Sequence, residues 1–198
     1  SADVTGDGIA NVLSFDSEGI WRVSELNENG EVTSEVWTQW TNAEQWKDVS
    51  TGDFNGDGLM DIAGRADSGS WWVAESNGNE FTNVNWGKWT PTIDWLHVAV
   101  GDFNGDGRSD IVGRAATNGS WWIATSAGNQ FSNSNWGRWT TAVDWDVHVG
   151  DYNGDGLADV AGRASSDGTW WIGASNGTRF VNSYWGRFTN SVQWTEFQ

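Results

Sequence analysis

The sequence predicts an all-β protein built from four similar repeats, and three observations support that prediction. A nine-residue acidic string that begins at Asp53 returns at positions 102 and 151, and a weaker copy begins at position 3, so the copies start 49 or 50 residues apart. Trp-Trp pairs and Gly-Arg-Ala triplets recur at the same spacing in the last three repeats. No stretch shows the 3.6-residue hydrophobic period that indicates a helix.

The second repeat illustrates the elements that we expect in each unit. Segments 49–54 and 60–66 enter and leave the acidic string, 70–76 is rich in Trp and Val, and 80–86 completes a fourth strand. Asn77-Gly78 has the composition of a tight hairpin turn, and residues 87–95 link to the next repeat. Four-stranded units repeating at this length predict the blades of a β-propeller. Adjacent Trp71 and Trp72 point to opposite faces of their strand, and both faces of a blade pack against neighbouring blades.

The two ends of the chain suggest how the repeats are closed. Trp46 and Trp95 each precede the next acidic string by seven positions, and joining the end of the chain to its start gives Trp194 the same distance from Asp3. We therefore expect residues 1–198 to form a single domain of four blades closed by pairing of N- and C-terminal strands. A fragment of a larger ring, or two chains pairing into an eight-bladed ring, would also fit.

Composition narrows the functional classes. The 198 residues carry a formal charge of −17, which argues against binding to nucleic acid because phosphate neutralisation needs clustered Lys and Arg. The chain has no Cys, which excludes disulfides and thiol chemistry. No apolar run approaches the roughly 20 residues of a membrane-spanning helix. We expect an extracellular or cell-surface protein whose secretion signal lies outside this chain.

The acidic strings have the composition of a metal loop. Oxygen-bearing side chains at alternate positions, followed by Gly and a further carboxylate, suit a hard cation such as Ca²⁺. Eleven of the 27 acidic residues lie in the four strings, and four bound Ca²⁺ ions would bring the net charge to about −9. An EF-hand is disfavoured, because position 12 is Gly64, Gly113 or Gly162 and the flanks alternate like strands. A plain turn is the remaining alternative, although it needs no final Asp.

The strings and their spacing resemble the FG-GAP/VCBS repeat, the calcium-loop blade of integrin α-type propellers and of many bacterial extracellular proteins. The resemblance covers the whole chain and implies Ca²⁺ as the cofactor, with three strong sites and one weak or empty site. The implied ligands of the strong sites are four side chains and one backbone carbonyl in each loop: Asp53, Asn55, Asp57, Asp61 and the carbonyl of Leu59; Asp102, Asn104, Asp106, Asp110 and the carbonyl of Arg108; Asp151, Asn153, Asp155, Asp159 and the carbonyl of Leu157. The first loop departs from the pattern, with Asp3, Thr5, Asp7, Asn11 and the carbonyl of Ile9.

Basic and aromatic residues that recur in register are the candidates for ligand binding. Arg65, Arg114 and Arg163 share one repeat position, where they would either face a ligand as a ring of cations or serve the packing of each blade. Trp89 and Trp139 lie in the predicted connections between blades. They would either stack against sugars or seal the gaps between blades.

These patterns favour a calcium-stabilised binding or adhesion module, with lectin-like glycan binding through repeated aromatic sites, over an enzyme. The two histidines are read as strand residues, and no catalytic motif is present. We expect a glycan or an extracellular protein as ligand, and a monomer or a dimer. The alternatives are a polysaccharide lyase or hydrolase that uses non-repeated residues of the first repeat, and a purely structural or protein-interaction propeller. The non-repeated residues are Arg22, Glu25, Glu28, Glu31 and Glu35.

Overall fold

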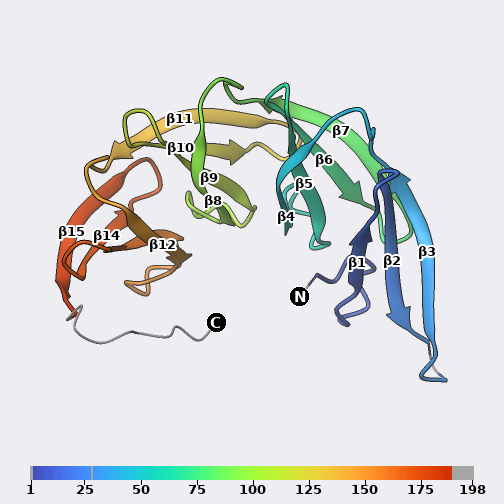
Figure 1. Cartoon of the computed structure of the whole chain (residues 1–198). Helices are drawn as coiled ribbons and strands as arrows, with labels where there is room; N and C mark the ends of the chain where they lie inside the picture. The colour runs from blue at the N-terminus through green and yellow to red at the C-terminus, as the bar shows by residue number, and fades with distance from the viewer. Residues whose placement is uncertain (1, 28, 189–198) are drawn as a thin grey trace. The chain divides into compact units, whose positions relative to one another are not determined.

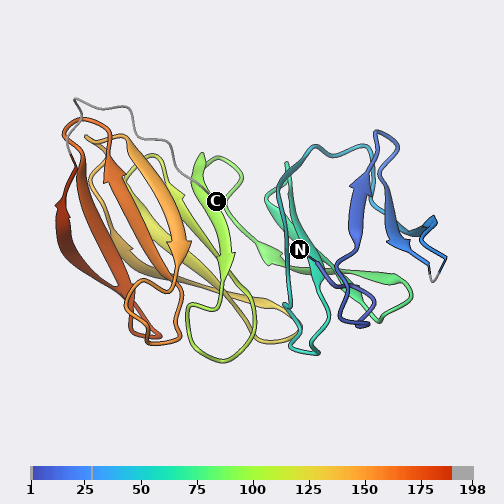
Figure 2. The same ribbon diagram turned by 90° about the horizontal axis from the view of Figure 1, so that it is seen from below.

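The computed structural model describes residues 2–27 and 29–188, and this part of the chain is all-β, as predicted (Figure 1). Within these described residues, fifteen strands form one three-stranded and three four-stranded sheets, and the strands of each sheet lie side by side in chain order (Figure 2). Neighbouring strands in the first, second and fourth sheets are antiparallel. Within the described residues there is no helix of the length and apolarity that a membrane span requires.

Each sheet corresponds to one sequence repeat. The first consists of β1 (Val12–Phe15), β2 (Ile20–Leu26) and β3 (Val32–Gln39). The second consists of β4 (Trp46–Gly52), β5 (Asp61–Ala66), β6 (Ser70–Ser76) and β7 (Phe81–Lys88). The third consists of β8 (Trp95–Gly101), β9 (Asp110–Ala115), β10 (Ser120–Ser126) and β11 (Phe131–Arg138). The fourth consists of β12 (Trp145–Gly150), β13 (Asp159–Ala164), β14 (Thr169–Ser175) and β15 (Phe180–Arg187).

The predicted strands of the second repeat are confirmed, with shifted ends: β4 begins at Trp46 and not at position 49, and β5 and β7 each begin one residue later than predicted. Strand β4 ends at Gly52 and not at position 54, because Asp53 and Phe54 already belong to the acidic loop. Strand β7 continues to Lys88, which places the first part of the predicted connection inside the sheet. The register slips between Trp71 and Trp72, so Trp86 is an extra residue in β7, and Gly87 adopts φ 148° beside it. The recurring Trp-Gly pair is therefore a β-bulge.

The chain divides into two compact units, which are described separately. The first consists of Ser1–Thr92, Gly107–Asp110 and Ala124–Ser132, and the second of Ile93–Asp106, Ile111–Ile123 and Asn133–Gln198. The apolar core of the first unit includes Val4, Trp21, Trp40, Ile62 and Phe81. The core of the second includes Phe103, Trp121, Trp139, Val160 and Phe180. The single domain over residues 1–198 stays a prediction.

The first sheet has no strand equivalent to β4, β8 and β12 among the described residues. Ala2 makes only an isolated antiparallel bridge to Asn11, at the position where β4 meets β5 in the second repeat. The closing strand that we predict at residues 194–198 lies outside the described residues. Four-blade closure therefore stays a prediction.

One aromatic contact explains why two of the repeated motifs occur together. In the second unit the Trp139 ring lies over Gly162, where an added Cβ would come within 2.3 Å of the indole. Its Nε1 donates a hydrogen bond of 2.8 Å to Asn182 Oδ1. Trp40, Gly64 and Asn83 repeat this arrangement in the first unit. The Gly of Gly-Arg-Ala is therefore required by the tryptophan that packs on it.

Gly162→Ala should test this contact directly. We expect the substitution to lower the free energy of unfolding by about 1–3 kcal/mol, because the methyl group overpacks a site already filled by the Trp139 ring. Chemical denaturation of the two proteins measures the difference. Gly150→Ala is the matched control, because a Cβ there meets only the Tyr152 ring at ordinary contact distance. Equal losses in both variants would contradict the packing argument.

Candidate functional site

The acidic loops fold around their first carboxylate. Asp53 Oδ1 accepts hydrogen bonds from the backbone N–H groups of Gly56 and Asp57, and its Oδ2 accepts one from Gly58. Gly56 and Gly58 adopt φ values of 81° and 89°, a backbone conformation that residues other than Gly rarely adopt. Asp151 binds the equivalent three groups in the fourth repeat. The two Gly residues of each string thus let the backbone wrap around one carboxylate.

The middle of the loop presents its oxygen atoms near solvent. Asn55 Nδ2 donates to Asp57 Oδ2 at 2.9 Å, and Asp57 Oδ1 accepts a bond from Leu59 N at 2.8 Å. Asp57 is exposed, and Asp53 and Asn55 are half-buried. Asn104 and Asp106 pair in the same way, as do Asn153 and Asp155. The predicted side-chain ligands at positions one, three and five of the string are therefore brought to one loop surface.

The last carboxylate of the string has a different environment. Asp61 is 0 % exposed, and its two oxygens accept hydrogen bonds from the backbone N–H groups of Ser76, Phe54 and Asn55. Burial raises the pKa of this carboxyl to about 7, although the backbone donors lower it. Asp110 and Asp159 are equally buried, and each accepts a bond from the equivalent Ser N–H. This residue therefore joins the loop to the third strand of its own sheet.

Consecutive loops are also linked to one another. Ser76 Oγ donates to the carbonyl of Val4 in the preceding loop at 2.6 Å, and Met60 N donates to the carbonyl of Asp3. The same two bonds recur in the later repeats. The residues predicted to contribute backbone carbonyls also touch the preceding loop: a Cβ at Gly6, Gly56 or Gly105 would lie within 2.7–3.0 Å of the side chain of Leu59, Arg108 or Leu157. Ile9 is instead 61 % exposed.

The donor set fits Ca²⁺ in chemistry, because every predicted ligand atom is a hard oxygen. In residues 2–27 and 29–188, no three His, Asp or Glu side chains converge closely enough to form a metal site. The reason is visible in the second loop, where Asp53 accepts backbone N–H groups, Asp57 accepts the Leu59 N–H and the Asn55 amide, and Asp61 lies on the buried side. A carboxylate accepts about four hydrogen bonds or metal contacts, so Asp53 and Asp57 keep acceptor capacity. Calcium binding stays a prediction.

The first loop departs from the others in a structurally consistent way. Asn11 is 7 % exposed, and its Oδ1 accepts the bond from Val4 N that Asp61 accepts from Phe54 N in the second loop. Its Nδ2 donates to Glu25 at 3.5 Å. Asn therefore preserves the hydrogen bond that closes the loop while removing one negative charge. Asp3 keeps its backbone donors, and Thr5 replaces the amide.

The three register-matched arginines have different surroundings. Arg65 is 6 % exposed and forms an ion pair with Asp48, which is the packing role that the sequence left open. Arg114 is 3 % exposed and donates to the carbonyl of Thr140. Arg163 is half-buried. Arg65 and Arg114 are too buried to form the exposed ring of cations that was the alternative.

The aromatic candidates require a correction. Trp89 and Trp139 are only 3 % and 5 % exposed, so neither offers a free ring face on which a sugar could stack. They pack inside the units instead, each against a tryptophan in the third strand of its own sheet. Trp89, for example, lies edge-on against Trp71. Their burial fits the alternative prediction, sealing the gaps between blades, better than it fits sugar stacking.

The structure shows one aromatic site that the sequence did not identify. Trp171 is 37 % exposed and lines a pocket of about 310 Å³ in the second unit. Trp139 forms part of the wall of this pocket, together with Arg138, Asp167 and Asn182. The signal was present in the Trp-Trp pair, but the sequence gives no means of telling which of the three copies keeps an accessible face.

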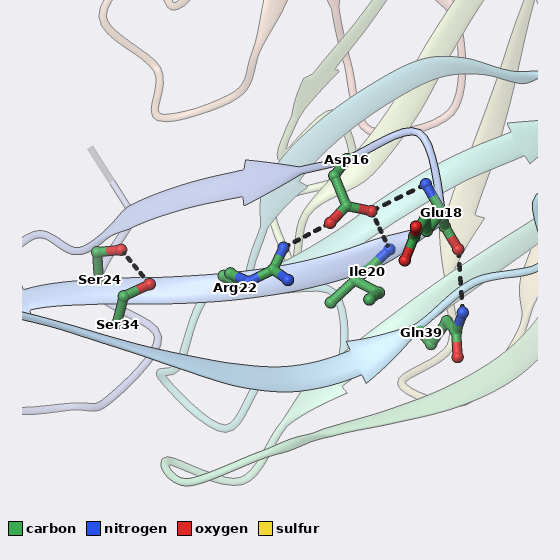
Figure 3. A network of polar contacts seen from close by, with 7 residues as sticks. All are labelled: Asp16, Glu18, Ile20, Arg22, Ser24, Ser34 and Gln39. Carbon is green, nitrogen blue, oxygen red and sulfur yellow. Dashed lines mark hydrogen bonds and ion pairs between the residues drawn. The ribbon is translucent and has the colours of Figure 1, made fainter.

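The non-repeated residues of the first repeat have mixed roles. Arg22 pairs with Asp16, whose other oxygen accepts the N–H groups of Glu18 and Ile20 in the turn between β1 and β2 (Figure 3). Arg22 therefore supports a hairpin. Glu25 and Glu35 line a second pocket of about 150 Å³. Glu28 lies outside the described residues.

Ser175→Ala tests the link between loops. The hydroxyl donates to Phe103 O at 2.6 Å and accepts from Gly177 N at 3.0 Å. Its removal leaves the buried Phe103 carbonyl and the part-buried Gly177 N–H without this partner, so we expect a loss of about 1–3 kcal/mol in unfolding free energy. Urea denaturation gives the value. Ser183→Ala, on the exposed face of β15, should change stability by less than about 0.5 kcal/mol.

Comparison with known proteins agrees with this architecture. A family model described as the FG-GAP-like repeat matches residues 3–64 and 63–113, which together span more than half of the chain. The two matches cover the first two acidic loops completely and extend through the third. A comparison with curated proteins finds no match. The chain belongs to the FG-GAP-like repeat family.

Proposed function

We propose that this chain is a calcium-stabilised extracellular binding module of the propeller type, with lectin-like binding of a glycan. The observation that carries the calcium part is the loop present in all four repeats, in which the backbone closes around one carboxylate and further oxygen atoms remain near solvent. Catalysis is not part of the proposal, because the carboxylates of the loops recur in every repeat for a structural reason.

Calcium would be held by oxygen atoms that the loop already gathers. In the second repeat these are the side chains of Asp53, Asn55 and Asp57 and the carbonyl of Leu59, with Asp61 adding negative charge from the buried side. The ion would supply positive charge where three carboxylates lie within nine residues. Loop folding and calcium affinity are then coupled, because a cation that binds only the folded loop stabilises it.

Adding Ca²⁺ to protein stripped with EDTA should raise the melting temperature by at least about 5 °C at millimolar ion, since each occupied site contributes roughly 1.5–3 kcal/mol at ten to a hundred times its dissociation constant. Differential scanning calorimetry measures the shift. Asp57→Asn should reduce it, whereas Glu80→Gln, which removes the same charge outside the loops, should not. A melting temperature insensitive to both EDTA and Ca²⁺ would refute calcium stabilisation.

The glycan part of the proposal is supported by the pocket beside Trp171. A half-exposed indole provides an apolar face for the C–H groups of a pyranose ring. Asp167 Oδ1 accepts hydrogen bonds from the backbone and hydroxyl of Thr169, which leaves Oδ2 for a ligand. The carbonyl of the Asn182 amide is held by Trp139, which leaves its NH₂ group. An aromatic wall with a few fixed polar groups is the usual make-up of a small-molecule site.

The first unit shows why this pocket is open in the second. Glu44 of the first unit occupies the same repeat position as Val143 of the second. The Glu44 carboxylate accepts a hydrogen bond from Ser68 N at 3.4 Å. Val143 has no polar group to make such a bond and is shorter. The turn before β14 is also one residue longer than its counterpart before β6. The pocket therefore depends on features that distinguish one repeat from another.

Trp171→Ala should weaken binding to a glycan identified on an array by about tenfold, because it removes the stacking face. Titration calorimetry in Ca²⁺ gives the affinity. Trp185→Ala is the control, because Trp185 is 52 % exposed but does not line the pocket. Equal effects of the two substitutions would indicate non-specific adhesion to surface tryptophans. Release of sugar products during the titration would instead favour the enzyme alternative and direct attention to Glu25 and Glu35.

We also propose that four blades close into one ring through the chain termini. The support is the missing strand of the first sheet and the spacing of Trp194 from Asp3. Hydrophobic side chains remain exposed on the first and last sheets. Val12, Leu26 and Val32 are more than 60 % exposed on the first, and Trp185 and Phe188 are 52 % exposed at the end of the last. Apolar side chains exposed in this number favour a covering partner.

Replacing residues 194–198 with a Gly/Ser sequence of equal length should lower the melting temperature by several degrees, because the strand that would cover the edge of β1 is lost. The measurement is thermal unfolding, accompanied by light scattering for aggregation. An unchanged melting temperature would count against closure by this segment. A loss that depends on protein concentration would instead support pairing between two chains.

A further inference from the structure

One repeat position has a left-handed backbone in two different residues. Asp48 and His97 each precede their acidic loop by five residues and adopt φ values of 54° and 53°. In the first unit Asp48 uses this conformation to reach a buried cation. Its Oδ2 accepts hydrogen bonds from Arg65 Nε at 2.7 Å and Nη2 at 2.6 Å. The side chain at this position therefore serves as the counter-ion of the following arginine.

The third repeat keeps the arginine and loses the counter-ion. Arg114 occupies the position of Arg65 and is 3 % exposed, but His97 stands where Asp48 stands in the second repeat. Arg114 Nη2 donates to Thr140 O at 2.7 Å, and its Nε has no hydrogen-bond partner among the described residues. Burial lowers the pKa of Arg114, and Asp144 raises it electrostatically without forming an ion pair. A guanidinium buried in this way favours an anionic partner.

The same two residues line a pocket of about 290 Å³ that lies within the second unit. Leu96, Ala142 and Val143 provide apolar walls, and Asp144 is the acidic residue of the lining. Burial lowers the pKa of His97, so its imidazole is neutral at pH 7 and carries one N–H donor. The pocket thus combines a buried cation, a neutral donor and an apolar lining.

We propose that this pocket, the Arg114 pocket, binds the carboxylate group of a small organic acid. The ligand carboxylate takes the place that the Asp48 carboxylate holds beside Arg65, and the rest of the ligand lies against the apolar walls. Arg is suited to this role because its planar N–H groups match the geometry of a carboxylate. Asp144 disfavours ligands with a second negative charge. This site lies apart from the acidic loops and needs neither calcium nor the Trp171 pocket.

Two simple carboxylates test the proposal and distinguish the two kinds of ligand that could supply the carboxylate group. Sodium propionate and sodium glucuronate are titrated, in separate experiments, into the full-length protein up to about 100 mM, with NaCl holding the ionic strength constant. His97 and His148 are the only histidines, so NMR resolves the two rings. We expect a saturable shift of the His97 signals and none of His148. Binding of both acids indicates a general carboxylate site, and binding of glucuronate alone indicates an acidic saccharide. No saturable His97 shift with either acid overturns the proposal.

A matched pair of variants tests the mechanism. Asp and Asn both tolerate a left-handed backbone, so His97→Asp and His97→Asn place similar side chains at one strained position. His97→Asp supplies an internal carboxylate and should weaken binding of the acid at least tenfold by calorimetry while raising the melting temperature. His97→Asn supplies no charge and should stay within about threefold of the original affinity. Equal affinities in the two variants would overturn the assignment of Arg114 as the binding cation.

Discussion

The structure depends on a carboxylate that the solvent does not reach. Asp61, Asp110 and Asp159 each start the second strand of a sheet with no exposed surface. Such a charge is costly to bury unless its oxygens are satisfied, and the backbone donors around Asp61 satisfy it. One side chain thereby fixes the end of its loop and the start of the hairpin that follows the neighbouring strand. Loop shape and sheet register are set by the same group.

The spacing of the repeats follows from a second hydrogen bond, which joins each repeat to the loop before it. The serine whose N–H meets that aspartate donates its own hydroxyl to a carbonyl in the preceding loop, 72 residues earlier in each case. An insertion within the strands between one loop and the serine of the next repeat would displace this donor from its acceptor. Nearly constant spacing is therefore a geometric requirement of a chain of linked loops.

The sequence was sufficient for the features that every repeat must share. Strand positions, the loops and the family follow from repetition, because each unit solves the same packing problem. It was insufficient where burial decides the role of a side chain. Trp139 and Trp171 carry the same indole and line the same pocket, yet Trp139 is 5 % exposed and Trp171 is 37 % exposed, and only the three-dimensional surroundings distinguish them. The string predicts Asp61 as a fourth metal ligand, which stays a prediction, and only the fold shows that its oxygens also accept backbone hydrogen bonds.

Departures from the repeat are informative because the repeated positions define what packing alone requires. Asn11 in place of an aspartate keeps the hydrogen bond that closes the loop, so that change is explained by structure. Val143 in place of Glu44 removes the hydrogen bond that Glu44 accepts from Ser68, and it leaves space for the Trp171 pocket. His97 in place of Asp48 leaves a buried guanidinium without its carboxylate, which packing does not require and stability does not favour. A change that costs stability at one copy of a repeated position, and opens toward a pocket there, is best understood as serving a ligand.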